Sequence, residues 1–322
     1  MQSNSTVILV GGFGFVGRNV LEVMNTQNAF GVLRPAVIDN LANAAPNYKS
    51  LDLPAYHGNY QDPDALTFLD TLESGTSGTG GRIFVFLAGE TRVAESRERP
   101  MDFIAANIDM PSRFVLDAIR PQDHFILIST AGALFDGTFE VRKDSAYCPK
   151  NFYGATKAAE ELILQKLVEQ RGATYSAIRL TNVYGRFSEQ KKSAIHVFVR
   201  SAIAGHEIAI NGDGQQKRDF VYAGDVGRAI ATQALRVHEN ADLSTVNMVG
   251  SGVSSPLMDV VHAIETASGK KLRCKTEAAT DLLKTEPRHV IANSHDVRDL
   301  LQDGVTPLQE GIRQTLAYYL DQ

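Results

Sequence analysis

The stretch Thr6-Val7-Ile8-Leu9-Val10-Gly11-Gly12-Phe13-Gly14-Phe15-Val16-Gly17 decides how the rest of the chain is interpreted. Its first part is apolar, which predicts a buried strand, and the segment that follows, to about residue 28, has the apolar spacing of a helix. Gly11 permits a tight turn, Gly14 leaves bare backbone that a phosphate can approach, and Gly17 allows close packing of the helix on the strand. A phosphate would bind at the helix N-terminus, where free N–H groups and the helix dipole favour negative charge.

A second apolar run ends at Asp39, about twenty residues beyond the glycines. A carboxylate at the end of the second strand accepts hydrogen bonds from both hydroxyls of an adenosine ribose, and it repels the 2′-phosphate of NADP. The strand, the glycine spacing, the helix and the acidic residue together predict a binding site for NAD.

Composition and charge narrow the class of protein. The chain has 322 residues, of which 43% are hydrophobic and 21% are charged, as is usual for a globular protein of one large domain or two. The net charge of −5, without a basic block, argues against binding to nucleic acid or to a membrane surface. We find no signal peptide and no apolar run of membrane length, and Cys148 and Cys274 lack metal-ligand spacing. We therefore expect a cytoplasmic protein without a metal site.

The order of the apolar segments predicts an α/β fold. After Asp39 we expect strands near residues 55–57, 82–87, 124–128 and 174–178, helices over 62–72, 101–119 and 151–170, and a flexible surface loop at 74–81. This alternation indicates a Rossmann-type doubly wound parallel sheet of six or seven strands. We assign residues 1–180 to an NAD-binding domain and residues 181–322 to a smaller α/β substrate-binding domain, partly interleaved with the first.

Tyr153 and Lys157 form a candidate proton-transfer pair. They are four residues apart on a predicted helix, so their side chains lie on the same face. An ammonium group near a tyrosine hydroxyl, reinforced by the positive nicotinamide of NAD⁺, favours the phenolate and lowers the tyrosine pKa. Such a tyrosine can exchange a proton with a sugar hydroxyl near neutral pH. Thr130, at the carboxyl end of a central strand, can hydrogen-bond the same oxygen and align it for hydride transfer.

Further motifs follow one another along nearly the whole chain. They are Val37-Ile38-Asp39-Asn40-Leu41, Leu87-Ala88-Gly89, Val93-Ala94-Glu95-Ser96, Asn107, Ser129-Thr130, Tyr153 to Lys157, Arg179-Leu180-Thr181-Asn182-Val183-Tyr184-Gly185, Gly212-Asp213-Gly214, Arg218-Asp219-Phe220-Val221-Tyr222 and Asp225-Val226. With Gly11 to Gly17, this set resembles the extended short-chain dehydrogenases/reductases of the NAD-dependent nucleotide-sugar epimerase and dehydratase family. Within that family the chain is most similar to the UDP-galactose 4-epimerases.

The resemblance implies roles for the matched residues. Thr130, Tyr153 and Lys157 would be catalytic, and Lys157 would also hold the nicotinamide ribose. The implied NAD-binding residues are Gly11, Gly14, Phe15, Val16, Gly17, Asp39, Asn40, Asn59, Tyr60, Leu87, Ala88, Gly89, Asn107, Tyr153 and Lys157. The implied substrate-binding residues are Thr91, Asn182, Arg218 and Arg288. A guanidinium suits a pyrophosphate, and an asparagine supplies a donor and an acceptor.

Departures from the family pattern reduce the number of reactions that the chain could catalyse. Dehydratases of the family follow the catalytic threonine with Asp-Glu, and its 3,5-epimerases place a cysteine there, whereas this chain has Ala131-Gly132. Asn59 stands where relatives carry an acidic residue near the adenine. The stretch Glu286-Pro287-Arg288-His289 replaces the Arg-Pro-Gly-Asp of the family, so the second phosphate-binding arginine is either displaced to Arg288 or missing.

These observations favour an NAD-dependent nucleotide-sugar 4-epimerase that acts through a transient 4-keto sugar. A nucleotide-4-ketosugar reductase would use the same three catalytic residues, and a dinucleotide-binding regulator without turnover would share only the fold. The sugar and the nucleotide stay open at this stage.

We also expect a homodimer. The family resemblance implies a four-helix bundle built from residues 101–119 and 151–170 of each subunit. Both predicted helices carry more apolar residues than one buried face explains, including Phe103, Ile104, Phe114, Leu162 and Ile163.

Overall fold

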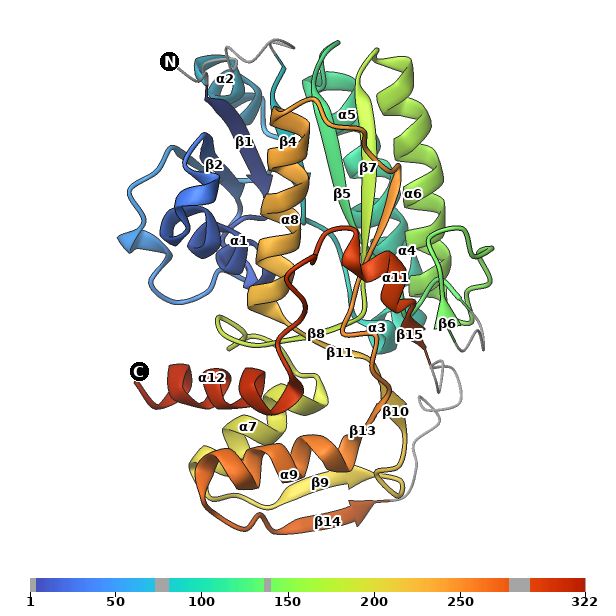
Figure 1. Cartoon of the computed structure of the whole chain (residues 1–322). Helices are drawn as coiled ribbons and strands as arrows, with labels where there is room; N and C mark the ends of the chain where they lie inside the picture. Colours follow the sequence, from blue (N-terminus) through green and yellow to red (C-terminus); the bar gives the residue numbers. More distant parts are fainter. Residues whose placement is uncertain (1–3, 73–80, 136–139, 278–289, 322) are drawn as a thin grey trace.

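Seven parallel strands form the central sheet of the computed structural model, in the order β12-β7-β5-β4-β1-β2-β3 (Figure 1). They are β1 (Ser5–Val10), β2 (Leu33–Asp39), β3 (Ala55–His57), β4 (Ile83–Phe86), β5 (His124–Thr130), β7 (Thr174–Leu180) and β12 (Val246–Val249). The structure describes residues 4–72, 81–135, 140–277 and 290–321, so most of the predicted loop at 74–81 lies outside the described residues. The predicted α/β fold of the Rossmann type is confirmed.

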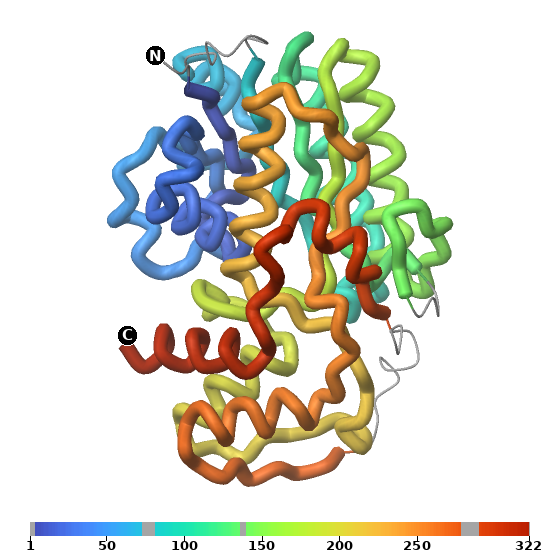
Figure 2. Tube along the Cα trace, in the orientation of Figure 1, coloured from blue at the N-terminus to red at the C-terminus, as the bar shows by residue number. Residues whose placement is uncertain are grey.

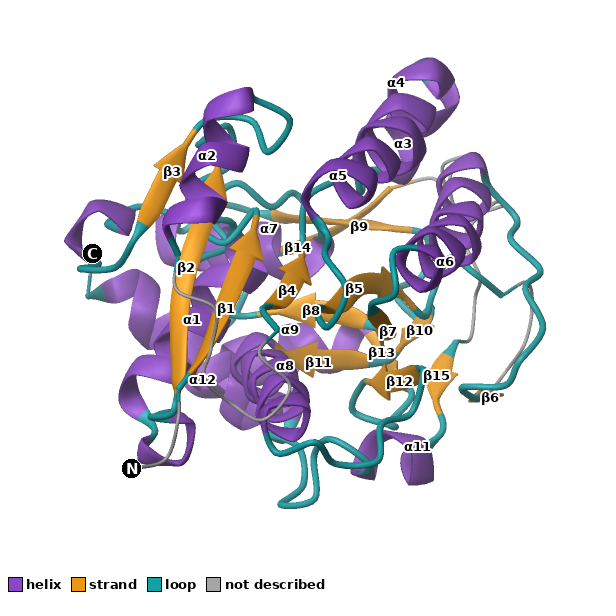
Figure 3. Cartoon of the chain, turned by 90° about the horizontal axis from the view of Figure 1, so that it is seen from above, coloured by secondary structure: helices purple, strands orange, loops and turns teal. Residues whose placement is uncertain are grey.

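Helices cover both faces of this sheet (Figure 3). Helices α2 (Pro63–Thr71), α5 (Met110–Ala118) and α6 (Phe152–Gln170) pack on one face, and α1 (Phe15–Thr26) and α8 (Ala223–His238) pack on the other. In β1, Ile8 and Val10 point to the first face, whereas Val7 and Leu9 point to the second. Burial on both faces explains why the strands are apolar at successive positions rather than alternating. In the described part of the chain, no helix has both the length and the apolar character needed to cross a membrane.

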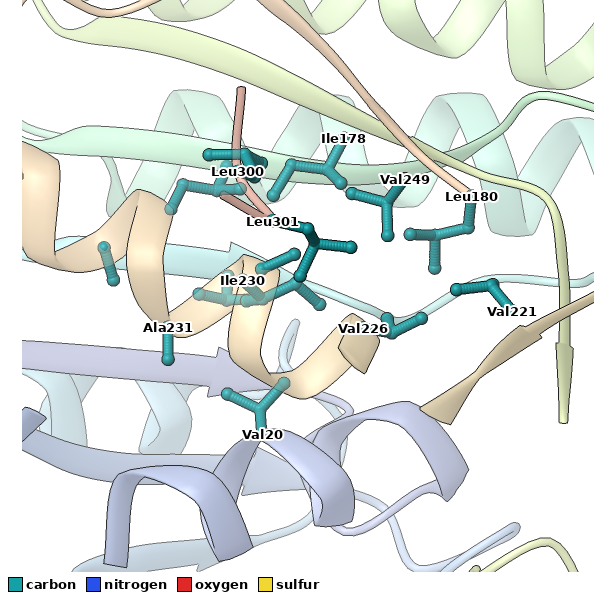
Figure 4. Close-up of a cluster of buried hydrophobic side chains, with 14 of the residues drawn as sticks. Val20, Ile178, Leu180, Val221, Val226, Ile230, Ala231, Val249, Leu300 and Leu301 are labelled. Atoms are coloured by element: carbon teal, nitrogen blue, oxygen red, sulfur yellow. The ribbon is translucent and has the colours of Figure 1, made fainter. Parts of the chain in front are cut away.

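Segments beyond residue 180 complete this sheet. Strand β12 pairs with β7, and helix α8 packs against α1, where a Cβ on Gly227 would lie 2.5 Å from the carbonyl oxygen of Asn19. Figure 4 shows Val226 and Ile230 of α8 close to Val20 of α1 and among side chains of β7 and β12. The seventh strand therefore comes from the part that we assigned to the substrate-binding domain, and the boundary at residue 180 stays a prediction.

The predicted helix 101–119 is divided into three segments. Helix α4 (Pro100–Ile104) continues into a π-helical turn, η3 (Ala105–Asp109), which continues into α5. Pro111 has no N–H to donate to the carbonyl of Asn107, and its ring crowds that carbonyl, so a regular α-helix is disfavoured there. The widened turn carries Asn107, in line with the frequent occurrence of such turns at functional sites.

A second group of elements lies beyond the carboxyl ends of the sheet strands (Figures 1 and 2). It contains α7 (Ala194–Ala204), α9 (Leu257–Ser268), α12 (Leu308–Leu320) and the parallel pair β9 (Ile208–Asn211) and β14 (Cys274–Glu277). These elements share their own cluster of buried side chains, which includes Phe198, Val260 and Ile312. This group thus lies beyond the edge of the sheet at which an α/β fold binds its ligand.

Candidate functional site

The glycine turn after β1 has the geometry that the sequence predicts. Gly11 has a positive φ of 82°, and a Cβ on it would lie 3.1 Å from the backbone nitrogen of Ala88, so this turn touches the loop that contains Leu87, Ala88 and Gly89. A Cβ on Gly17 would lie 2.4 Å from the carbonyl oxygen of Gly12, which demands glycine for close packing of α1. The loops after β1 and β4 thus form one continuous backbone surface.

Of the three glycines at positions 11, 14 and 17, Gly14 is the one that protein packing does not explain. A Cβ on Gly14 would approach no described atom more closely than 3.4 Å, which is ordinary contact. Gly14 is the N-cap of α1 and has no side chain to satisfy the free N–H groups of Phe15, Val16 and Gly17. Bare backbone beside an uncapped helix N-terminus fits the pyrophosphate of a dinucleotide.

Asp39, at the end of β2, is held toward the same turn. Its Oδ2 accepts a hydrogen bond from the backbone N–H of Phe13 at 2.9 Å, and its Oδ1 accepts one from the N–H of Leu41 at 2.7 Å. Burial raises the pKa of Asp39 above its ordinary value, and these two hydrogen bonds oppose that rise. Each carboxylate oxygen keeps a further lone pair, so the group can still accept hydrogen bonds from ribose hydroxyls.

Three other predicted cofactor residues differ in their surroundings. Exposed Asn40 donates through Nδ2 to Oδ1 of Asn59 at 3.1 Å, next to Asp39. The ring of Tyr60 instead points inward, with its centroid 5.3 Å from that of Phe86, and burial raises the pKa of its hydroxyl. Of these three residues, the two asparagines therefore offer exposed side chains beside Asp39.

Asn107 holds the loop after β4 from behind. Its side chain is fully buried, its Oδ1 accepts from the N–H of Glu90 at 2.8 Å, and its Nδ2 donates to the carbonyl of Glu90 and to the Thr156 hydroxyl. A Cβ on Gly89 would lie 2.8 Å from this Oδ1. The polar atoms of Asn107 thus have protein partners, and the residue shapes the predicted cofactor loop through its backbone.

The predicted catalytic residues lie together where α6 meets the end of β5. The Asn151 side chain caps α6 by accepting from the N–H of Gly154 at 2.8 Å. A Cβ on Gly154 would lie 2.1 Å from the carbonyl oxygen of Ala133, so glycine permits this close approach. As a result, the side chains of Thr130 and Tyr153 are hydrogen-bonded, and the Lys157 ammonium lies near the tyrosine.

The electrostatics of this group correct one prediction. The pKa of Tyr153 is raised, because burial has the largest effect and Glu160 adds to it, while Lys157 and the Thr130 hydrogen bond lower it. The Lys157 ammonium donates to the carbonyl of Ile128 at 3.2 Å and also forms an ion pair with Glu160. The sequence analysis predicted a lowered pKa for Tyr153 because it considered neither the burial of this residue nor the carboxylate of Glu160.

The substrate-side predictions lie on paired segments beyond the sheet. Asn182, in β8 (Asn182–Tyr184), is opposite Phe220 of β11 (Phe220–Tyr222), and its Nδ2 donates to the carbonyl of Asp219 at 3.1 Å. Arg218 ends β10 (Lys217–Arg218), directly before Asp219. Thr91 is exposed in the loop after β4, and Arg288 lies outside the described residues.

Three further residues support this site, although the sequence analysis assigned no role to them. The Ser96 hydroxyl accepts from the backbone N–H of Tyr153 at 3.2 Å. Buried Asp219 accepts from the N–H groups of Ser251 and Ala292 at 2.6 and 3.0 Å, which joins the segment of Arg218 to two later segments of the chain. The third residue is Glu160, three positions after Lys157 and therefore on the same helix face. That spacing was the available signal for Glu160.

The position of Asp39 predicts discrimination between the two dinucleotides. We expect NAD(H) to bind far more tightly than NADP(H), because a 2′-phosphate would meet the Asp39 carboxylate. Replacement Asp39→Ala should narrow the gap between the two dissociation constants, measured by calorimetric titration. Equal affinity of the wild-type protein for NAD and NADP would contradict this role of Asp39.

Comparison with known proteins agrees with this geometry. Residues 7–248 match the model of the "NAD dependent epimerase/dehydratase family". The "Uncharacterized UDP-glucose epimerase YtcB" of Bacillus subtilis is 26% identical over 97% of both chains. UDP-glucuronic acid 4-epimerase from Bacillus cereus, solved with UDP-glucuronic acid and NAD, superimposes with a TM-score of 0.82 at 19% identity, over 98% of this chain and 99% of its own.

A different reaction occurs on the same fold. The NAD dependent NDP-hexosamine 5,6-dehydratase TunA superimposes with a TM-score of 0.78 at 21% identity, over 98% of each chain. Fold similarity at this level therefore does not select the reaction. With its matching family model, its glycine turn and its Thr130, Tyr153 and Lys157 group, the chain belongs to the NAD dependent epimerase/dehydratase family of extended short-chain dehydrogenases/reductases and is an NAD-dependent enzyme.

Proposed function

We propose that this enzyme is a nucleotide-sugar 4-epimerase that acts through a transient 4-keto sugar. The observation that carries the proposal is the group formed by Thr130, Tyr153 and Lys157, which lies at the same sheet edge as the glycine turn. Asn182 and Arg218 belong to the segments beyond that edge and would bind the diphosphate of the substrate. We propose likewise that the chain after residue 180 mainly shapes the sugar site.

Each residue of the group has a distinct task in this reaction. Tyr153 takes the proton from the C4 hydroxyl and returns it after the 4-keto sugar has rotated to present its other face. Thr130 hydrogen-bonds Tyr153 and aligns the reacting oxygen, and Lys157 lowers the pKa of the tyrosine hydroxyl. When bound, NAD⁺ supplies the acceptor for the hydride from C4.

The residues after Thr130 support epimerisation over loss of water. A dehydratase needs an acid and a base beside the sugar carbons that lose water. Ala131 is fully buried, and a Cβ on Gly132 would meet no described atom within 4 Å, so there is room for a side chain at position 132 but none is present. The chain thus lacks the acidic pair at these two positions.

A panel of nucleotide sugars tests the proposal. The purified protein is incubated with UDP-, dTDP- and GDP-sugars, with and without added NADH, and the products are separated by chromatography. We expect one sugar to interconvert with its 4-epimer without net consumption of NADH. Stoichiometric NADH consumption would show that the protein is a 4-ketosugar reductase and not an epimerase. NAD binding without turnover of any sugar would favour a dinucleotide-binding regulator.

Substitutions in the catalytic group should separate proton transfer from cofactor binding. Tyr153→Phe keeps the ring, so we expect normal NAD binding and a rate lower by about two to four orders of magnitude. Lys157→Met should also weaken NAD binding and displace the rising limb of the pH–rate profile to higher pH, because the ammonium lowers the pKa of Tyr153. Thr130→Val should slow turnover with less effect on NAD. Near-normal turnover by Tyr153→Phe, measured in steady state, would exclude it as the proton carrier.

We also propose that two subunits pair through α5 and α6. Phe103 and Phe114, which we had counted toward this surface, are buried in the subunit core. Leu162 and Ile163 of α6 and Leu116 of α5 are 52%, 37% and 44% exposed, and such side chains would be covered in a dimer.

A charged substitution tests this pairing. Leu162→Asp should convert a dimer into a monomer in light scattering at micromolar concentration, because a carboxylate would be buried at the interface. Leu320→Asp is the matched control, since Leu320 is 67% exposed on α12 and should leave the dimer intact. A monomeric wild-type protein under the same conditions would refute the proposed pairing.

A further inference from the structure

A fully buried carboxylate lies beneath the candidate proton-transfer pair. Glu160 of α6 has no exposed surface, and one of its oxygens forms an ion pair with the Lys157 ammonium. Its other oxygen, Oε1, has no hydrogen-bond partner among the described residues. The side chain of Lys157 is itself only 6% exposed, so both charges are shielded from water. Electrostatic interactions are strong in such surroundings.

The neighbouring glutamate has a different partner. Glu161 forms an ion pair with Arg179 at 2.8 Å and accepts from the Tyr147 hydroxyl at 2.6 Å, so its charge is matched within that group. Glu160 therefore has the larger effect on the charge of Lys157, and Glu161 has a smaller one. The remaining titratable groups around Glu160 are Tyr153 and Glu161 on α6, Tyr60 after β3 and Tyr175 on β7. None of the tyrosines adds a positive charge.

The charge of Glu160 has a consequence for the cofactor. The family resemblance implies that Lys157 holds the nicotinamide ribose, and in the proposed function a positive nicotinamide ring would therefore lie close to a buried ammonium. Without Glu160, two like charges would repel each other at low effective dielectric. With Glu160 ionised, Lys157 and Glu160 sum to zero, and the ring of NAD⁺ lies near a neutral pair.

We infer that Glu160 is a positioning residue that fixes the Lys157 ammonium and, by its negative charge, makes the site bind NAD⁺ in preference to NADH. The inference rests on the proposed placement of Lys157 beside the nicotinamide. It does not require that the reaction be an epimerisation. A purely structural ion pair would stabilise the fold but would not distinguish the two oxidation states, since NAD⁺ and NADH differ in the charge of the ring and share all other groups.

The test compares the two oxidation states in one protein. The full chain is equilibrated with defined mixtures of NAD⁺ and NADH, without sugar, and the bound NADH is measured by its fluorescence at pH 8. Glu160→Gln keeps the shape and removes the charge, so the preference for NAD⁺ should fall by about threefold to tenfold, as expected for one partly screened charge. Glu160→Asp keeps the charge and should preserve the preference to within about twofold.

Glu169→Gln is the matched control, because it makes the same change on the same helix in an exposed carboxylate that pairs with Lys166. Its preference for NAD⁺ should equal that of the wild type. An unchanged preference in Glu160→Gln would overturn the inference. If Lys157→Met also left the binding of both forms unaltered, the placement of Lys157 in the proposed function would fail as well.

The pH dependence of the preference for NAD⁺ gives a second readout. It can be measured on the wild-type protein, so it does not depend on whether a substituted protein folds. Burial raises the pKa of Glu160 to about 7, and the nearby ammonium opposes this rise. The negative charge is therefore present above that pH and lost below it. The preference of the wild-type protein for NAD⁺ should rise between pH 6 and pH 8, whereas that of Glu160→Gln should stay level. A wild-type preference for NAD⁺ that fell as the pH rose would contradict the role of Glu160.

Discussion

The parallel alignment of the strands is the constraint on which the site depends. Because the carboxyl ends of parallel strands meet at one edge, the loops after β1, β2, β4 and β5 converge there. This brings Gly14, Asp39, Ala88 and Thr130 to one side of the molecule from positions far apart in the chain. Helix α6 then adds Tyr153 through the close approach of Gly154 to Ala133. A change in strand order would separate these residues without altering any of them.

Burial gives the catalytic group its electrostatic character. By itself it would keep Tyr153 protonated and would favour the neutral forms of Lys157 and Glu160. The net pKa of Lys157 is nevertheless raised, because burial lowers it less than Glu160 and Tyr153 raise it. The protonation state of Tyr153 therefore depends on opposing charges. The positively charged nicotinamide ring of bound NAD⁺ would favour the phenolate form of Tyr153. Proton transfer and cofactor charge are coupled in the same small volume.

Local patterns predicted the parts of this site that depend on neighbouring residues in the sequence. The turn at Gly11 to Gly17, the carboxylate of Asp39 and the spacing of Tyr153 and Lys157 required only the periods of strands and helices. Strand β12 was missed because its pairing with β7 joins distant segments. Glu160 was missed for another reason: two consecutive glutamates suggest a solvated helix face, and only tertiary packing shows that both are buried.

Transfer of the C4 hydrogen tests the account most directly. A nucleotide sugar that the enzyme converts is prepared with deuterium at C4 and incubated in ordinary water without added NADH, and the product is analysed by mass spectrometry and NMR. The account predicts that the 4-epimer keeps its deuterium at C4, because the hydride leaves and returns within one closed site. Loss of the label to solvent, or product formation only when NADH is supplied, would contradict epimerisation through a retained cofactor.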